Sequence, residues 1–164
     1  MGRKGKSLEI NRVILDEALE GVKTIFLDTS PVIYYLENHA VFADVVQGVI
    51  NKLDGGELQG VISPVTLAEC LVNPLKNRDQ KLQQDYVDFL LRHKSIRMVQ
   101  IETKIGILAA QLRAKYSLKL PDGFQVATAI RSGCEALLTN DDQFRRVFDL
   151  QVLVVKDFVT GNIL

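Results

Sequence analysis

Short unbroken apolar runs alternate along the chain with longer segments in which apolar residues recur at helical spacing. Each short run is typical of a strand that is buried on both faces of a sheet. The predicted strands cover residues 24–27, 58–62, 96–101, 136–138 and 152–155. The predicted helices cover residues 8–19, 29–37, 41–53, 63–72, 78–92, 102–116, 121–132 and 141–148. This alternation predicts a parallel sheet that helices cover on both faces.

Hydroxyl–proline pairs mark the start of two predicted helices. Ser30–Pro31 and Ser63–Pro64 each place a capping hydroxyl before a proline, which suits the first helical position because its N–H would lack a partner there anyway. Pro74 predicts the end of the second of these helices, since a proline inside a helix removes a hydrogen bond. Ligands of such parallel sheets bind beyond the carboxyl ends of the strands, so chemistry is expected there.

The bulk composition fits one packed domain. The chain has 164 residues, of which 47% are hydrophobic. Twenty Lys and Arg residues balance twenty Asp and Glu residues, so attraction to a nucleic acid must come from local basic patches or bound cations. No apolar segment is long enough to cross a bilayer, and the basic start lacks the apolar run of a signal peptide. We therefore expect a cytoplasmic protein with no membrane partner.

The cysteines and histidines narrow the chemistry further. Cys70 and Cys134 lie in apolar stretches, which favours buried free thiols over a disulfide. His39 and His93 are the only histidines, and they are far apart and without companion cysteines. A zinc site of the usual nitrogen and sulfur ligands is therefore not expected.

Four acidic residues fall at or just after strand ends or helix starts of the predicted fold. They are Asp28, Glu69, Asp122 and Asp141. Each also has a structural interpretation: Asp122 and Asp141 suit the first turn of a helix, and Glu69 could line a solvated helix face. Asp28 is the exception, because a charged residue that ends a buried central strand seldom lacks a function.

Gathered in one cleft, these carboxylates would repel one another by about 4 kcal/mol per close pair at about 4 Å. Some would then take up protons with raised pKa values. A hard divalent cation removes this conflict, and Mg²⁺ or Mn²⁺ prefers oxygen ligands with retained waters. A metal-loaded acidic pocket suits a phosphodiester substrate, because the ion neutralises phosphate charge and lowers the pKa of a bound water.

Four segments around these acids resemble, in the right order, the motifs of PIN domains. The matching segments are Phe26–Ser30, Val65–Glu69, Leu120–Ala129 and Leu138–Phe144. The last of these motifs has, in PIN domains, a Thr, an Asp two residues later and a Phe three residues after that. This spacing assigns the motif's acidic residue to Asp141 rather than to Asp142. The resemblance extends over most of residues 24–155. It implies a three-layer α/β/α PIN-like fold with a central, mainly parallel sheet of about five strands.

The resemblance also implies a function and a site. PIN domains of the VapC-like kind are metal-dependent endoribonucleases, most often the toxin of a toxin–antitoxin pair, and a homodimer is common among them. Asp28 and Asp122 would be the most direct ligands of Mg²⁺ or Mn²⁺, Asp141 would complete the site, and Glu69 would bind metal or position water. Thr29 and Thr139 would align these carboxylates through hydrogen bonds.

This chain departs from the family pattern at two places. Gly123 stands where an alanine is more usual, which predicts a looser helix start. In addition, residues 1–23 precede the first motif and form a basic tail, Met1–Ser7, and an extra helix. For this helix, packing on the core is preferred over docking of an antitoxin or self-association. The PIN-like nuclease domain then covers residues 24–164.

Contacts with RNA are predicted from nearby basic and aromatic residues. Arg145 and Arg146 follow Asp141 and are the preferred candidates for the RNA backbone, against the alternative of a solvated helix face. Tyr34 and Tyr35 could stack a base, although core packing of at least one is favoured.

Two other functional classes stay open beside the nuclease. A catalytically idle PIN-like module would bind RNA or a protein without cleavage. An aspartyl-phosphate phosphatase is disfavoured, because Ser30 stands where its second Asp is needed.

Overall fold

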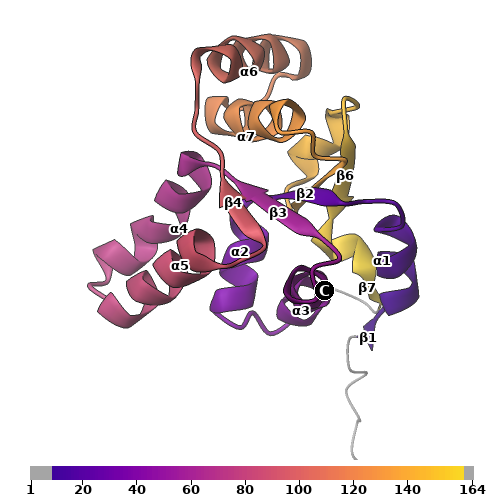
Figure 1. The fold of residues 1–164 in the computed structure, drawn as a ribbon, viewed down its shortest axis with the longest axis vertical. Coiled ribbons are helices and arrows are strands. Elements are labelled where there is room, and N and C mark those ends of the chain that lie inside the picture. The colour runs from indigo at the N-terminus through magenta and orange to yellow at the C-terminus, as the bar shows by residue number, and fades with distance from the viewer. Residues whose placement is uncertain (1–8, 161–164) are drawn as a thin grey trace, which may run out of the picture.

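The computed structural model describes residues 9–160 and centres on a sheet of five strands (Figure 1). The strands are β2 (Thr24–Leu27), β3 (Gln59–Ile62), β4 (Ile96–Met98), β5 (Ala136–Thr139) and β6 (Gln151–Val154). They lie in the order β4-β3-β2-β5-β6, and every neighbouring pair is parallel. The predicted parallel sheet of about five strands is therefore confirmed.

Helices cover both faces of this sheet. They are α2 (Thr29–Leu36), α3 (Ala43–Asp54), α4 (Pro64–Lys76), α5 (Gln80–Arg92), α6 (Thr103–Tyr116) and α7 (Leu120–Arg131). Helices α6 and α7 lie together on one side of the sheet, and α2 and α3 lie on the other (Figure 1). The fold is a three-layer α/β/α sandwich, as the sequence predicts.

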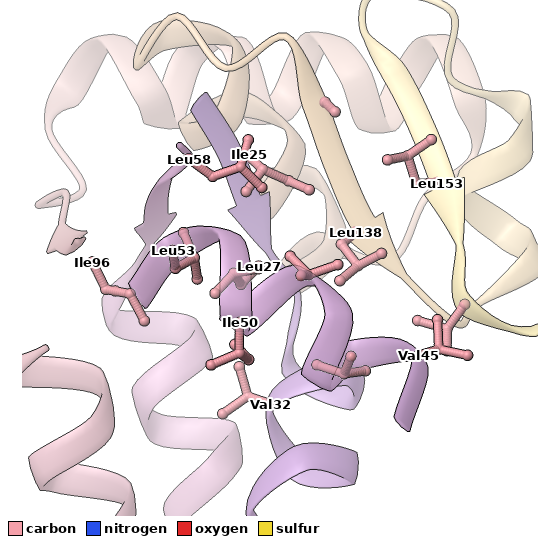
Figure 2. Packing of buried hydrophobic residues seen from close by; sticks show 14 of the residues in the cluster. Ile25, Leu27, Val32, Val45, Ile50, Leu53, Leu58, Ile96, Leu138 and Leu153 are labelled. Atoms are coloured by element: carbon pink, nitrogen blue, oxygen red, sulfur yellow. The ribbon is translucent and has the colours of Figure 1, made fainter. Parts of the chain in front are cut away.

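The alternation of side chains along β2 builds a separate core on each face. Ile25 and Leu27 belong to the cluster that α2 and α3 cover, where Ile50 of α3 packs near Leu27 (Figure 2). Phe26 points the other way, into the cluster formed with α6 and α7. All three side chains are almost fully buried, which explains the unbroken apolar run of this strand.

The order of the strands defines where a ligand would bind. From β2 the chain proceeds to β3 and β4 on one side, then crosses to β5 on the other. The strand order therefore switches direction between β2 and β5, and such switch points form binding crevices at the carboxyl edge of a sheet. The register pairs Leu27 with Leu138, so Asp28, which follows β2, is a neighbour of Thr139, the last residue of β5.

Helices α6 and α7 approach each other closely at Gly123. A Cβ atom at this position would lie 3.0 Å from the carbonyl oxygen of Ala109 on α6. The glycine at the start of α7 is therefore explained by contact with α6, and any local loss of helix propensity is offset by this packing.

The end of α4 differs from the prediction, because the helix continues through Pro74 to Lys76. A proline inside a helix typically costs about 3 kcal/mol. Pro74 is buried, and its carbonyl accepts hydrogen bonds from the N–H of Asp79 at 2.9 Å and from the side chain of Gln83 on α5 at 3.2 Å. Packing against α5 thus keeps the last turn helical.

The ends of the described chain pair with each other. Strand β1 (Glu9–Ile10) is antiparallel to β7 (Val159–Thr160), and α1 (Arg12–Ala18) is shorter than the predicted helix over residues 8–19. Two-residue strands have no sequence periodicity, so this pairing was not predicted. The predicted helix over residues 141–148 is a 3₁₀ helix, η1 (Asp142–Arg146), and a second one, η2 (Val155–Phe158), follows β6. The predicted basic tail lies outside the described residues.

Two smaller expectations can be compared with the described part of the chain. None of its helices is long and apolar enough to cross a membrane. Cys70 and Cys134 are both buried free thiols, as predicted.

Candidate active site

Asp28 lies at the point where the strand order switches. It follows β2 directly and is the N-cap residue of α2, but its carboxylate makes no capping hydrogen bond. Only 8% of the residue is exposed. Burial is the main reason why the pKa of Asp28 is raised to about 6, and the nearby charges of Asp122 and Glu69 raise it further against the lowering effect of its hydrogen bonds. The carboxylate is therefore held in an environment that disfavours its negative charge.

Thr139 connects Asp28 with the loop that carries Asp141. This residue ends β5 and is fully buried. Its hydroxyl donates to Asp28 Oδ2 at 2.7 Å and accepts from the N–H of Asp141 at 3.1 Å. One hydroxyl thus orients the carboxylate that follows β2 and the backbone that follows β5.

Thr29 holds Glu69 in a similar way across two helices. The Thr29 hydroxyl at the start of α2 donates to Glu69 Oε2 of α4 at 2.5 Å. Glu69 is exposed, so this bond defines the direction in which its long side chain points. Its negative charge acts on both Asp28 and Asp122.

Asp122 and Asp141 complete the acidic cluster. Asp122 lies in the first turn of α7, where partial burial and the charges of Asp141 and Glu69 raise its pKa, while Lys119 lowers it. Asp141 caps η1 by accepting a hydrogen bond from the N–H of Gln143 at 2.8 Å. It therefore also has the helix-capping role that the sequence offered as an alternative to metal binding. The interactions among the four carboxylates show that the fold brings all four predicted acids to one edge of the sheet.

The donor set of this cluster suits a hard divalent cation. Within residues 9–160 no three Asp, Glu, His or Cys side chains meet closely enough to hold an ion together as they stand. Mg²⁺ does not require such a group, because it keeps several waters and is usually bound by one or two protein carboxylates. The all-oxygen donors and the raised pKa values of Asp28 and Asp122 therefore fit Mg²⁺ or Mn²⁺.

A buried amide, which the sequence analysis did not single out, lies behind Asp28. The Gln125 side chain on α7 is 1% exposed. Its amide nitrogen donates to Thr66 Oγ1 at 3.0 Å and, at 3.5 Å, to Asp28 Oδ1, while its oxygen accepts from Ser63 Oγ at 2.6 Å. Ser63 and Thr66 form the capping box that opens α4. The sequence signal that could have identified Gln125 is its position as a single amide within the mainly apolar segment after Phe124.

Replacing Gln125 with methionine is expected to lower the free energy of unfolding by about 1–3 kcal/mol, because buried partners lose their hydrogen bonds. Urea unfolding in the presence of a chelator measures this change. Gln111→Met on the exposed side of α6 is the matched control and should change stability by less than about 0.5 kcal/mol. Equal stabilities of the two variants would contradict the role assigned to Gln125.

An apolar groove of about 380 Å³ borders the acidic cluster. Its walls come from the N-terminal halves of α4 and α7, and Glu69 is one of the lining residues. The lining residues are Pro64, Val65, Ala68, Glu69, Leu120, Pro121 and Phe124. The groove therefore begins beside two of the four acids, since Pro121 directly precedes Asp122.

The predicted RNA-contacting residues have partners within the protein. The Arg145 guanidinium makes two hydrogen bonds to Asp157, at 2.7 and 2.8 Å, and one to Asp142 at 2.7 Å. Arg146 donates to the carbonyl of Tyr116 at 3.2 Å. A contact of Arg145 with RNA would have to replace these ion pairs, and the predicted role of both residues stays a prediction.

The two tyrosines near Asp28 take part in packing. Tyr34 lies 5.0 Å from the ring of Phe42 and accepts a hydrogen bond from Asn140 at 3.1 Å. Tyr35 packs against Phe89 at a ring distance of 5.2 Å. Core packing, the interpretation that the sequence favoured, is confirmed.

The protein is a three-layer α/β/α sandwich with carboxylates where its strand order switches. Comparison with known proteins identifies the family with this architecture. The family model described as PIN domain matches residues 25–149. This match covers most of the chain, and the protein therefore belongs to the PIN domain family. No curated protein sequence matches the chain.

Solved structures share this fold. VapBC2 from Rickettsia felis bound to a DNA fragment from its promoter matches with a TM-score of 0.65 and 19% identity, over 80% of this chain and 98% of the other. A toxin–antitoxin complex from Klebsiella pneumoniae matches with a TM-score of 0.61 and 23% identity, over 79% and 96%. Mycobacterium tuberculosis VapC20, a Sarcin-Ricin loop cleaving toxin, matches with a TM-score of 0.57 and 11% identity, over 69% and 86%. At these identities the matches establish the VapC-like fold.

Proposed function

We propose that this protein is a metal-dependent endoribonuclease that cleaves RNA phosphodiester bonds, and that it is the toxin of a toxin–antitoxin pair. The observation that carries this proposal is the convergence of four carboxylates on one edge of the sheet, with Asp28 buried at the switch point. PIN domains are generally nucleases, and membership of this family supports the same chemistry.

In this proposal Asp28 and Asp122 are the most direct metal ligands, and Asp141 and Glu69 complete the site. Thr139 keeps Asp28 oriented, and Thr29 keeps Glu69 turned toward the other acids. When bound, Mg²⁺ or Mn²⁺ would neutralise phosphate charge and make a water molecule more acidic. The protein itself supplies the orientation of the four carboxylates and the partial exclusion of solvent around Asp28.

The substrate and the partner are inferred from proteins that share the fold. VapC20 is a Sarcin-Ricin loop cleaving toxin, which supports RNA as the substrate. Several other structures with this fold are VapBC or toxin–antitoxin complexes, which supports an antitoxin as the protein partner. The predicted homodimer stays a prediction.

The test is cleavage of a mixed RNA pool by the purified protein, first with Mg²⁺ or Mn²⁺ and then with excess chelator. Cleavage that requires the metal is the expected result, because the carboxylates alone would repel the phosphate. Fragments are resolved on a denaturing gel. Cuts within the strand indicate an endonuclease, whereas stepwise shortening from one end indicates an exonuclease.

The alternative is a catalytically idle PIN-like module that binds RNA or a protein. Titration with Mn²⁺, followed by calorimetry, separates it from the nuclease. An idle module would cleave nothing and would show no metal binding that depends on Asp28 and Asp122. That pair of results would contradict the proposed function.

A further inference from the structure

Another pocket, of about 360 Å³, lies beside the edge strand β4, and none of the four carboxylates of the acidic cluster lines it. It is formed by β4 and the segment after it, by the first turn of α6 and by the last residue of α7. Three cations line it: Arg97, Lys104 and Arg131. The carboxylate of Glu102 also lines the pocket and offsets one of the three positive charges. We call this site the cationic pocket.

None of these three cations is used in an ion pair with a described residue. The ion pairs of the described chain engage other basic residues, such as Arg145 with Asp142 and Asp157. Arg97 donates to the carbonyl oxygen of Ser132 at 3.1 Å, which anchors the guanidinium beside the end of α7 without neutralising it. The cationic pocket therefore keeps a net positive charge in a protein whose overall charge is zero.

The start of α6 adds to this positive potential. The N-cap residue Glu102 makes no side-chain capping bond to the first turn. The unpaired N–H groups of a helix start carry partial positive charge and favour anions. Arginine guanidinium groups, moreover, bind phosphate through paired hydrogen bonds. The ligand that suits the cationic pocket is therefore a phosphate group.

The position of the pocket relates it to the acidic cluster. The N–H of Val99, which lines the pocket, donates to the carbonyl of Ile62 at 2.9 Å, two residues before Pro64 of the apolar groove. Phe124 in the groove and Arg131 in the pocket are seven residues apart on α7. They share one helix face, about 10 Å apart along its axis. The groove beside the acids and the cationic pocket therefore both contact the same side of α7.

We propose that the cationic pocket of Arg97, Lys104 and Arg131 binds a backbone phosphate of the RNA strand whose scissile phosphate lies at the acidic cluster. This inference rests on the proposed function, because it takes RNA as the ligand. It assigns the positioning of the strand to this pocket rather than to Arg145, whose guanidinium is already ion-paired with Asp142 and Asp157. Phosphate contacts of this kind position a nucleic acid without selecting its sequence.

The test measures binding instead of cleavage. The background is Asp28→Asn in the full chain with Mg²⁺ present, so that the RNA stays intact. The pocket variant adds Arg97→Gln, Lys104→Gln and Arg131→Gln, and the probe is a labelled single-stranded oligoribonucleotide pool followed by fluorescence anisotropy. We expect affinity to fall at least about tenfold. The log–log slope of affinity against salt concentration should weaken by about 0.7 for each phosphate that the variant no longer binds.

The matched control carries Arg12→Gln, Lys23→Gln and Lys76→Gln. These exposed cations lie away from the pocket and the groove, and their replacement removes the same total charge. The control should bind RNA nearly as tightly as the background protein. The single variant Lys104→Gln, at an exposed position, keeps the test informative if the triple pocket variant does not fold, and it should show a smaller loss in the same direction.

Equal losses in the pocket variant and the control would mean that only total charge matters, and would overturn the proposal. No loss in the pocket variant, or no RNA binding by the background protein, would overturn it as well. Cleavage by the wild type separates this inference from the proposed function. If RNA is cleaved but its binding does not depend on the pocket, the pocket is wrong and the nuclease stands. If binding depends on the pocket and no RNA is cleaved, the nuclease and the scissile phosphate at the acidic cluster are wrong, and only the RNA contact of the pocket stands.

Discussion

Replacing Asp28 with asparagine is expected to reduce metal-dependent RNA cleavage at least about a hundredfold while the protein stays folded. Changes behind the direct ligands of a metal site typically cost about 10–100-fold, so loss of a ligand itself should cost no less. Asparagine has nearly the same shape as aspartate and can still accept the hydrogen bond that Thr139 donates at 2.7 Å. Folding should therefore survive although the charge that binds the metal is gone.

The measurement is the initial rate of RNA cleavage at saturating Mn²⁺, with the circular dichroism spectrum as the check on folding. Asp142→Asn is the matched control. Asp142 is adjacent to Asp141 but is paired with Arg145 at 2.7 Å and with Lys156, and these partners lower its pKa. The control should keep its cleavage rate. A similar loss in both variants, or unfolding of Asp28→Asn, would count against a metal-binding role of Asp28.

The second large effect is expected in the stability of the metal-free protein as the pH changes. Burial raises the pKa of Asp28 to about 6 in the folded protein, against 3.8 for an unperturbed aspartate. Because the folded pKa is the higher one, the folded state binds the proton more tightly than the unfolded state does. The contribution of Asp28 to stability is therefore fully present below about pH 4 and is lost as the pH rises through about 6.

This difference in pKa corresponds to about 3 kcal/mol of unfolding free energy. Asp28→Asn resembles the protonated side chain and does not titrate. In chelator, the variant should match the wild type at about pH 4 and exceed its stability by up to about 3 kcal/mol above about pH 7. Urea unfolding of both proteins over this range measures the difference, and titrating groups that do not interact with Asp28 cancel in it.

Added Mn²⁺ provides the complementary observation. It should stabilise the wild type above about pH 7, since an ion that binds only the folded state adds to its stability, and should stabilise Asp28→Asn much less. Stability curves of the two proteins that run parallel from about pH 4 to about pH 8 would show that the Asp28 pKa is unperturbed. The raised pKa could then no longer be used as an argument for metal binding at Asp28.

Much of the fold could be read from the sequence because its signals are local. The unbroken apolar runs located all five strands of the main sheet, since a strand buried on both faces needs apolar side chains at successive positions. Ser63 and Pro64 marked the start of α4, because capping and the fixed backbone of proline act within one helical turn. Asp28, Asp122 and Asp141 could be named for the same reason, as each follows a strand or opens a helix, whereas Glu69 lies within α4.

Where the local signal was weak or opposed by packing, the prediction failed. Pro74 was expected to end α4, but contacts with α5 keep the helix intact to Lys76. The pairing of β1 with β7 joins residues from opposite ends of the chain, and two-residue strands leave no periodic pattern to detect. Packing against the following helix decided the first case, and pairing between opposite ends of the described chain decided the second.

By itself, the sequence determined which residues form the sheet and which four carboxylates lie at or just after its strand ends and helix starts. Only the tertiary structure decided that these carboxylates lie close enough to perturb one another's pKa values and that Gln125 is buried behind Asp28. It also decided that Arg145 is ion-paired, whereas Arg97, Lys104 and Arg131 line one pocket. Burial and hydrogen bonding are set by side chains that come together across the sheet, and no spacing along the chain records those distances.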